Sequence, residues 1–205
     1  MFERSNKRTF QYFHLFILFT VMAFFCPAFG QVSCSTVFND NKIRFNLSRV
    51  NKVLAQYNFH KITLDRWYEI NMKVNSIAAE QMFKNIEFNN NFEQNSPAQA
   101  TQISPEKYEV TLNPKVLREF PTSGQHLILL HELGHTRLDH PQLLIQYPEK
   151  RSQYEIEADI FAALAYPIFC RRTLKLSEFI NFVSTNVDTL PPGPLRSKIF
   201  KLLLY

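Results

Sequence analysis

The sequence lacks the features of several large protein classes. After residue 30 it has no apolar run long enough to span a bilayer, so we expect the body of the chain to be soluble. Only 3 Cys occur, and neither Cys34 nor Cys170 has the neighbours of a catalytic nucleophile. A formal net charge of +5 on 205 residues does not favour nucleic-acid binding. No internal repeat is visible, which argues against a solenoid.

The first 30 residues have the pattern of a secretory signal peptide. Three basic residues near the start precede an uncharged, largely apolar run, residues 9–25, and a small-x-small sequence at 28–30 follows. We predict cleavage after Gly30 and a secreted or periplasmic protein. Residues 9–25 kept as a membrane anchor are the alternative. In an oxidising compartment Cys34 and Cys170 could form one disulfide, or stay as two free thiols.

The most informative segment is residues 131–135, His-Glu-Leu-Gly-His. Two histidines four residues apart on a helix lie on one face, about one turn apart, so His131 and His135 can reach the same metal ion. Glu132 lies beside that ion without having to bind it. This spacing is typical of zinc hydrolases, in which the glutamate is a general base for a metal-bound water. The alternative is a pair of hydrogen-bonded core histidines.

The surrounding sequence predicts that the motif lies on a helix. Thr122 and Gln125 have the spacing of a capping box, which predicts a helix start about ten residues before the motif. Apolar residues at helical spacing flank the two histidines. Gly134 weakens a helix by about 1 kcal/mol relative to Ala, so its presence suggests that another element packs closely there.

A second helical stretch, residues 152–163, supplies the candidate third ligand. Glu155 and Asp159 are four residues apart and share a face, whereas Glu157 lies about 200° round from Glu155, so only one of the two glutamates can serve the site. We choose Glu155 as the metal ligand, because Asp159 can then accept the ring N–H of a zinc-bound histidine. The alternative is an ordinary solvated acidic face.

Between the two stretches, His140-Pro141 and Tyr147-Pro148 predict a loop that reverses the chain. Metzincin peptidases carry a third histidine ligand six residues after the second histidine, where this chain has Pro141. That pattern therefore fails. We expect His140 to be a helix C-terminal residue favoured by the helix dipole, outside the metal site.

Residues 31–205 fit one mostly helical α+β domain with its zinc-site core at about 108–166. Ala100–Ile103 and Tyr108–Leu112 predict a β-hairpin beside the motif helix. Tyr108–Leu112 is the candidate edge strand for holding extended substrate, with a plain structural strand as the alternative. The polar stretch 89–105 is interpreted as a surface loop or flexible insert. Further helices are expected at 42–58, 64–86, 176–187 and 194–204.

The motifs His-Glu-Leu-Gly-His and Glu-Ile-Glu-Ala-Asp-Ile-Phe-Ala together resemble those of gluzincin metallopeptidases. The resemblance is to HtpX/Ste24-type peptidases with their periplasmic BepA-like relatives, and to ImmA/IrrE-type peptidases. It implies a zincin-like fold, one zinc ion, Glu155 as third ligand and Asp159 four residues on. A Pro-rich stretch ending at Arg196 is similar to one in the Ste24-like relatives. The chain departs from the former group in lacking multiple membrane spans, and from the latter in its export signal.

These features predict an exported zinc metallopeptidase of endopeptidase type, acting on protein or peptide substrates. His131, His135 and Glu155 would hold the ion, and Glu132 would take a proton from the attacking water. The alternative is an exported zinc-binding chaperone or interaction protein that does not cut its partner. Candidates for a group that assists zinc at the oxyanion are Arg196, Tyr154, Tyr108 and Tyr147, among which the sequence does not choose.

Overall fold

Residues 40–75, 83–170, 175, 177–178 and 191–204 are described by the computed structural model, and they belong to one compact unit, residues 38–205. The predicted signal peptide, Cys34 and most of the predicted helix at 176–187 lie outside the described residues. Among the described helices, none is both long enough and apolar enough to cross a membrane.

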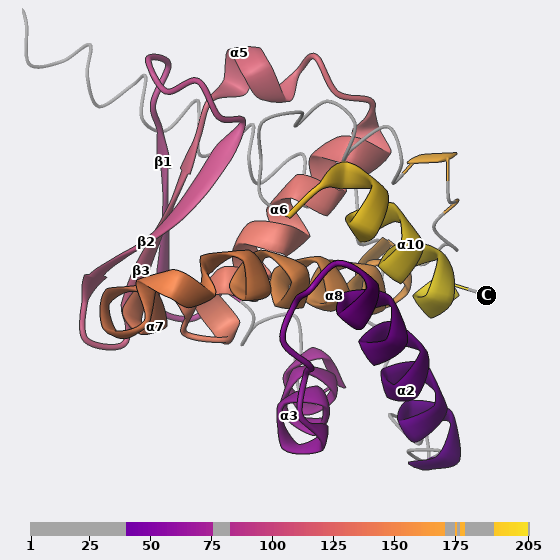
Figure 1. Ribbon diagram of the computed structural model, residues 1–205. Helices are drawn as coiled ribbons and strands as arrows, with labels where there is room; N and C mark the ends of the chain where they lie inside the picture. Colours follow the sequence, from indigo (N-terminus) through magenta and orange to yellow (C-terminus); the bar gives the residue numbers. More distant parts are fainter. Residues whose placement is uncertain (1–39, 76–82, 171–174, 176, 179–190, 205) are drawn as a thin grey trace, which may run out of the picture. The chain divides into compact units, whose positions relative to one another are not determined.

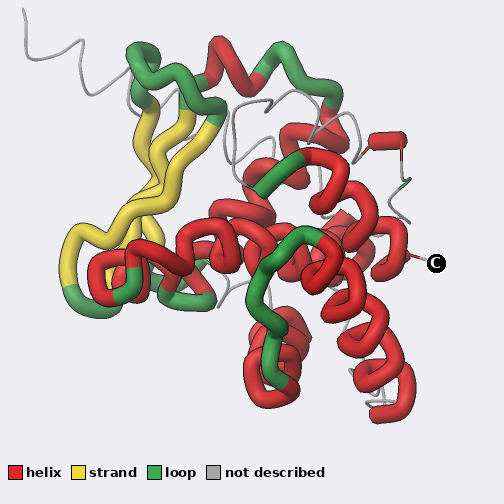
Figure 2. The backbone as a smooth tube through the Cα atoms, viewed as in Figure 1, coloured by secondary structure: helices red, strands yellow, loops and turns green. Residues whose placement is uncertain are grey.

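The fold is α+β, as predicted: helices predominate, and three strands form one small mixed sheet beside them (Figure 2). The longer helices are α2 (Asp40–Gln56), α3 (Leu64–Asn75), α6 (Thr122–Arg137), α8 (Arg151–Cys170) and α10 (Gly193–Leu204). The short helices are α5 (Pro114–Leu117), α7 (His140–Gln146) and the 3-10 turn η1 (Pro148–Lys150). The strands are β1 (Ile86–Asn90), β2 (Ala98–Ser104) and β3 (Lys107–Leu112).

Helices α6 and α8 make the most extensive helix–helix contact of the described residues (Figure 1). A Cβ atom built on Gly134 would lie 3.1 Å from Cβ of Phe161 and 3.2 Å from Cα of Ala158. These separations are tighter than most real Cβ contacts, so a side chain here would require a neighbour to shift by a few tenths of an ångström, and glycine lets the two helix backbones approach without that shift. The expected close packing at Gly134 is therefore confirmed. It brings the histidine motif directly onto α8.

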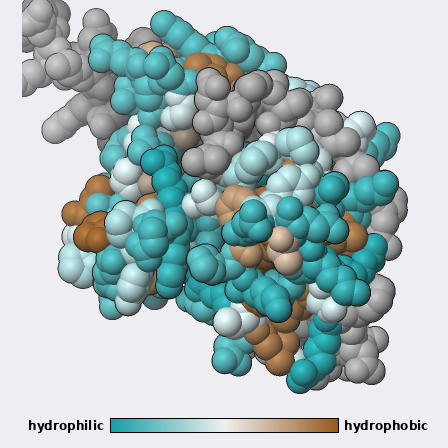
Figure 3. Space-filling view, viewed as in Figure 1, coloured by the Kyte–Doolittle hydropathy of each residue, from teal (hydrophilic) through white to brown (hydrophobic). Residues whose placement is uncertain are grey.

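Helices on other sides enclose α8. It contacts α3 and α10, and α10 in turn contacts α2. Trp67 of α3, Phe161 of α8 and Phe200 of α10 are among the largest side chains that are almost fully buried. On the face that Figure 3 shows, hydrophobic residues occur in small separate groups among hydrophilic ones. The apolar interior thus gathers around α8 and holds its polar residues in fixed positions.

The sheet has the strand order β1-β3-β2, with β3 antiparallel to β2 and parallel to β1. The predicted hairpin is present, but Tyr108–Leu112 is not the edge strand, because β1 pairs with it on its other side. Among the strands, β2 makes the most contacts with α6. The edge strand beside the motif helix is therefore β2.

Two other predictions are wrong at particular residues. The helix expected at 64–86 is a helix only to Asn75 among the described residues, since 83–85 form a turn and Ile86 begins β1. Asn85 has a left-handed backbone with φ 64°, which asparagine tolerates better than most residues and which ends helical propagation. The stretch 89–105 is not one loop, because it contains the end of β1 and all of β2.

Helix α6 begins at Thr122, close to the expected start, but without a capping box. Pro121 is the N-cap residue, and no side chain caps the helix. The Gln125 Nε2 atom instead donates to the carbonyl oxygen of Phe120 at 2.9 Å. Thr122 is already inside the helix, one position too late for its hydroxyl to cap it.

We predict that Gly134→Ala destabilises the protein by about 1–2 kcal/mol. The new methyl group pushes α6 away from α8, and this costs more free energy than the higher helix propensity of alanine gains. Thermal or denaturant unfolding measures the change. Gly124→Ala is the matched control: its Cβ would meet the side chain of Phe120 at 3.3 Å rather than another helix's backbone, so it should cost less. A Gly134→Ala protein as stable as the control would contradict the close-packing account.

Candidate metal centre

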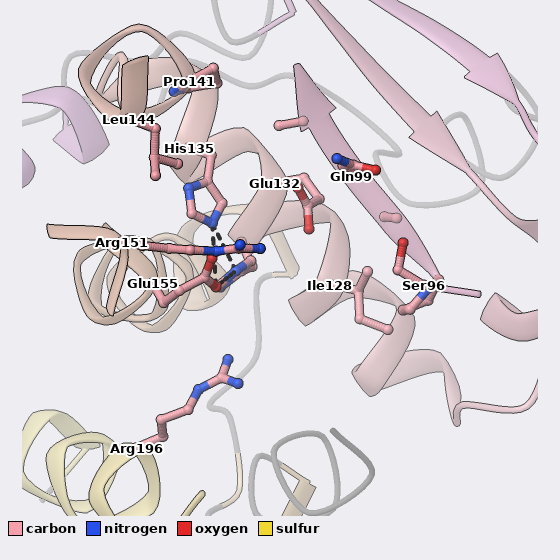
Figure 4. Close-up of a pocket in the computed structure, with 14 residues that line it drawn as sticks. Ser96, Gln99, Ile128, Glu132, His135, Pro141, Leu144, Arg151, Glu155 and Arg196 are labelled. Carbon is pink, nitrogen blue, oxygen red and sulfur yellow. Dashed lines mark hydrogen bonds and ion pairs between the residues drawn. The ribbon is translucent and has the colours of Figure 1, made fainter. Parts of the chain in front are cut away.

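Three donor atoms from α6 and α8 meet at one point. His131 Nε2 lies 3.0 Å from His135 Nε2 and 3.2 Å from Glu155 Oε2, and His135 Nε2 lies 3.6 Å from the same oxygen. Both histidines are buried, and Glu155 is partly exposed. Figure 4 shows His135 and Glu155 pointing toward each other from their two helices. The structure thus brings the three predicted ligands together as a group that could hold a metal ion.

The spacing of these atoms fits a small divalent ion. Bonds of about 2.0–2.2 Å at tetrahedral angles place the donors roughly 3.3 Å apart, which the 3.0–3.6 Å separations here bracket. Two imidazole nitrogens and one carboxylate oxygen suit zinc and related transition metals. Three protein donors also leave a further coordination position for water or substrate.

His131 is held from behind by a buried carboxylate. Its Nδ1 atom lies 3.0 Å from Asp159 Oδ1. Arg196 donates to the two oxygens of Asp159 from Nε at 2.6 Å and from Nη2 at 2.7 Å. Burial raises the pKa of Asp159, but the charge of Arg196 and these hydrogen bonds outweigh it and hold that pKa below its ordinary value. Asp159 is therefore an anionic acceptor for the ring N–H of His131, the place that the sequence predicted for it.

His135 is held by a second histidine, which the sequence analysis placed wrongly. His140 is not at a helix C-terminus: it is the first residue of α7, fully buried, with Nδ1 3.0 Å from Nδ1 of His135. Its Nε2 atom lies 3.1 Å from Glu157 Oε2. Asp139, with a left-handed φ of 58°, turns the chain so that the ring points back at α6.

Metal binding at His135 would set the direction of the hydrogen bonds between the two rings. If His135 binds a metal through Nε2, its Nδ1 carries the proton and donates to Nδ1 of His140. A neutral His140 then carries its own proton on Nε2 and donates to Glu157, although Nη2 of Arg66, which can only donate, lies 3.0 Å from the same nitrogen. Burial lowers the pKa of His140 to about 3 against the opposing effect of its hydrogen bond to Glu157, so the ring is neutral at pH 7 and can accept one bond while donating the other.

Glu157 is buried as well, so it does not belong to a solvated acidic face. Arg66 Nε donates to its Oε2 atom at 2.7 Å, and Gln153 Nε2 donates to its Oε1 atom at 2.9 Å. The prediction that only one of the two glutamates reaches the metal donors holds, since Glu155 is the one beside His131. Glu157 instead contacts His140, which in turn contacts His135 on the ring nitrogen that faces away from Glu155.

A third helix, α3, contributes Arg66 to the centre. No sequence motif predicted a role for this residue. Besides Glu157, Arg66 binds Glu69 through Nη1 at 2.7 Å and the carbonyl oxygen of Leu138 through Nη2 at 3.3 Å. Its contact therefore ties α3, α8 and the end of α6 together. The sequence offered one signal for this network: His140 and Glu157 are an acid–base pair close to the two motifs. It offered no signal for Arg66, which precedes His140 by 74 residues.

The metal donors open into a pocket of about 350 Å³. One wall is the start of β2 with the residues before it, Ser96 to Ala100, and another carries Pro141 and Leu144 of α7. Glu132 projects into the pocket between the donor group and β2 (Figure 4). The predicted general base therefore lines the same pocket as the metal donors.

The structure separates the four candidates for assisting at an oxyanion. Tyr154 is not among the pocket's lining residues, and its ring stacks on His140 with centroids 4.9 Å apart. Tyr108 donates to Asp139 at 2.5 Å, and the exposed Tyr147 lies under Lys150. Arg196 does line the pocket, although Asp159 binds its guanidinium.

The predicted disulfide involves one described residue. Cys170 lies at the end of α8, and its Sγ atom lies 3.5 Å from Nδ1 of His126. Cys34 lies outside the described residues.

No protein-family model, curated protein or solved structure matches this chain.

We predict that metal binding strengthens about tenfold per pH unit from pH 6.5 toward 10, because the ion must displace a proton from His131. Burial lowers the pKa of His131, but hydrogen bonds to Asp159 and Glu155 outweigh it and raise that pKa from 6.5 to about 10 in the metal-free protein. The raised pKa also stabilises the metal-free fold below pH 6.5, and this stability is lost as the pH rises through 10.

Calorimetric zinc titration in buffers of different ionisation enthalpy measures the released proton directly. About one proton per ion is expected at pH 7. The same affinity at each pH, with no proton release, would contradict the assignment of His131.

A second prediction concerns the partner of His135. His140→Ala should weaken zinc binding about 10- to 100-fold, because it removes the group that holds the His135 ring and tautomer. Competition with a chromogenic chelator measures the dissociation constant. His60→Ala, at an exposed histidine away from the centre, should bind zinc like the wild type. Equal affinities in the two variants would show that His140 does not support the metal donors.

Proposed function

We propose that this chain is a zinc metallopeptidase with a zincin-like active site. The observation that carries the proposal is the convergence of His131, His135 and Glu155 at the floor of an open pocket that Glu132 also lines. A purely structural zinc site is normally closed by four protein ligands. Among the described residues only three donors meet here, and they face a pocket.

Zinc, when bound, would lower the pKa of a water molecule and polarise the carbonyl group to be attacked. The chain's own residues supply the rest. Asp159 and His140 contact the Nδ1 atoms of the two imidazoles and so favour the tautomers that leave Nε2 unprotonated for the metal. Glu132 accepts the proton of the attacking water and then delivers it to the leaving amine, which the hydrolysis of an amide requires.

The edge strand β2 favours a peptide as the substrate. It is an outer strand of the sheet, and Ala98, Gln99 and Ala100 line the pocket beside the metal donors. An extended peptide can add to such an edge through backbone hydrogen bonds, which bind any sequence and set one peptide bond next to the ion. The sequence-based proposal of strand binding is kept, with β2 in place of Tyr108–Leu112.

Export of the protein also stays a proposal, since it rests on residues 1–30 alone. A protease acting outside the cytoplasm, and a zinc-binding protein that holds partners without cutting them, would both use the same metal centre. Cleavage of a substrate separates the two.

We expect Glu132→Gln to reduce peptide hydrolysis by at least 10²-fold while zinc stays bound, because the amide cannot accept the proton but leaves the donors unchanged. Hydrolysis of an unstructured protein or a peptide library is measured before and after chelation and zinc re-addition. Glu119→Gln, at an exposed glutamate outside the pocket, is the matched control and should cleave normally. Full activity of Glu132→Gln would overturn the mechanism, and zinc binding without any cleavage by the wild type would favour the non-proteolytic alternative.

A further inference from the structure

We infer that Arg151 binds a carboxylate of the substrate and thereby selects peptides that carry one beside the cleaved bond. This inference rests on the proposed peptidase function and adds a substrate class to it. Arg151 is exposed and lines the pocket of the metal donors. In Figure 4 its side chain extends from α8 toward the pocket, across His135 and Glu155 in that view.

The position of Arg151 follows from the helix. It precedes Glu155 by four residues on α8, so the two side chains share a face, about 6 Å apart along the helix axis. An extended peptide advances about 3.3–3.6 Å per residue. A carboxylate held by Arg151 therefore belongs to a residue one or two positions from the peptide bond that faces the ion.

The other arginine of the pocket is already bound. Arg196 is 3% exposed and holds Asp159 through two hydrogen bonds. Among the described residues, the side chain of Arg151 has no hydrogen-bond or ion-pair partner. It is thus a guanidinium available to a ligand, and guanidinium groups bind carboxylates in bidentate geometry.

The charges at the pocket also favour an anionic group. Glu132 and Glu155 together balance one divalent ion, and Asp159 balances Arg196, which leaves the charge of Arg151. Two of the walls are neutral: residues 96–100, which lead into β2, contribute Ser, Pro, Ala and Gln side chains, and α7 contributes Pro141 and Leu144. With the ion bound, an acidic group on the substrate would therefore meet one positive charge, that of Arg151, which no carboxylate of the pocket balances.

Two kinds of peptide carry such a carboxylate: one that ends there with a free C-terminus, and one with an Asp or Glu side chain. Both present the same chemistry to Arg151. Peptides that differ only in this group distinguish them.

The test uses the full chain loaded with zinc and carrying Glu132→Gln, so that bound peptide is not cleaved. Fluorescence anisotropy measures the affinity of labelled peptides in two matched pairs: free C-terminus against C-terminal amide, and, in an amidated peptide, Glu against Gln near the centre. We expect the carboxylate form of at least one pair to bind about 10- to 100-fold more tightly, as for a hydrogen bond to a charged group.

Arg151→Ala should remove this preference and leave the zinc content unchanged, and Arg151→Lys should keep part of it. Arg118→Ala, at an exposed arginine outside the pocket, should keep it in full. Preference in the first pair would identify a C-terminal carboxylate, and preference in the second an acidic side chain. No preference in either pair, or a preference that survives Arg151→Ala, would overturn the inference.

The result is separable from the proposed function. If the wild type cleaves peptides with and without the carboxylate equally well, the peptidase proposal stands and the proposed role of Arg151 is wrong. A protein that prefers carboxylate peptides but cleaves none keeps the binding site and loses the peptidase.

Discussion

The close approach of α6 and α8 at Gly134 is the constraint on which the metal centre depends. His131 and His135 are on one helix and Glu155 is on the other, so their donor atoms meet only at a short interhelical distance. Gly134 lies between the two histidines and against Ala158, and a Cβ atom at that position would be 3.2 Å from the backbone of α8. The histidine pair and the helix contact are therefore built by the same short segment.

Two buried chains of hydrogen bonds then fix the imidazoles. Asp159 and Arg196 hold His131 and connect it to α10, while His140, Glu157 and Arg66 hold His135 and connect it to α3. Each chain ends on an arginine, so the buried carboxylates are paired rather than left as isolated charges. Helices α3 and α10, which are far apart in the sequence, thus both contribute to the centre that α6 and α8 build.

Short-range patterns carried most of what could be predicted. The placement of His131 and His135 on one helix face, and of Glu155 and Asp159 on another, follows from helical geometry, and the fold class follows from periodicity. Three features needed tertiary structure. His140 looked like an ordinary helix-end residue because its burial depends on the turn at Asp139. Arg66 is distant in sequence. The order β1-β3-β2 depends on a parallel pairing that no local pattern records.

The central claim is that two imidazoles and one carboxylate bind a single ion. The most direct test is a crystal structure of the zinc-loaded protein with anomalous difference maps at the zinc edge. The account predicts one peak, bonded to Nε2 of His131, Nε2 of His135 and a carboxylate oxygen of Glu155. A peak elsewhere, or a well-ordered centre in which Glu155 does not touch the ion, would contradict it.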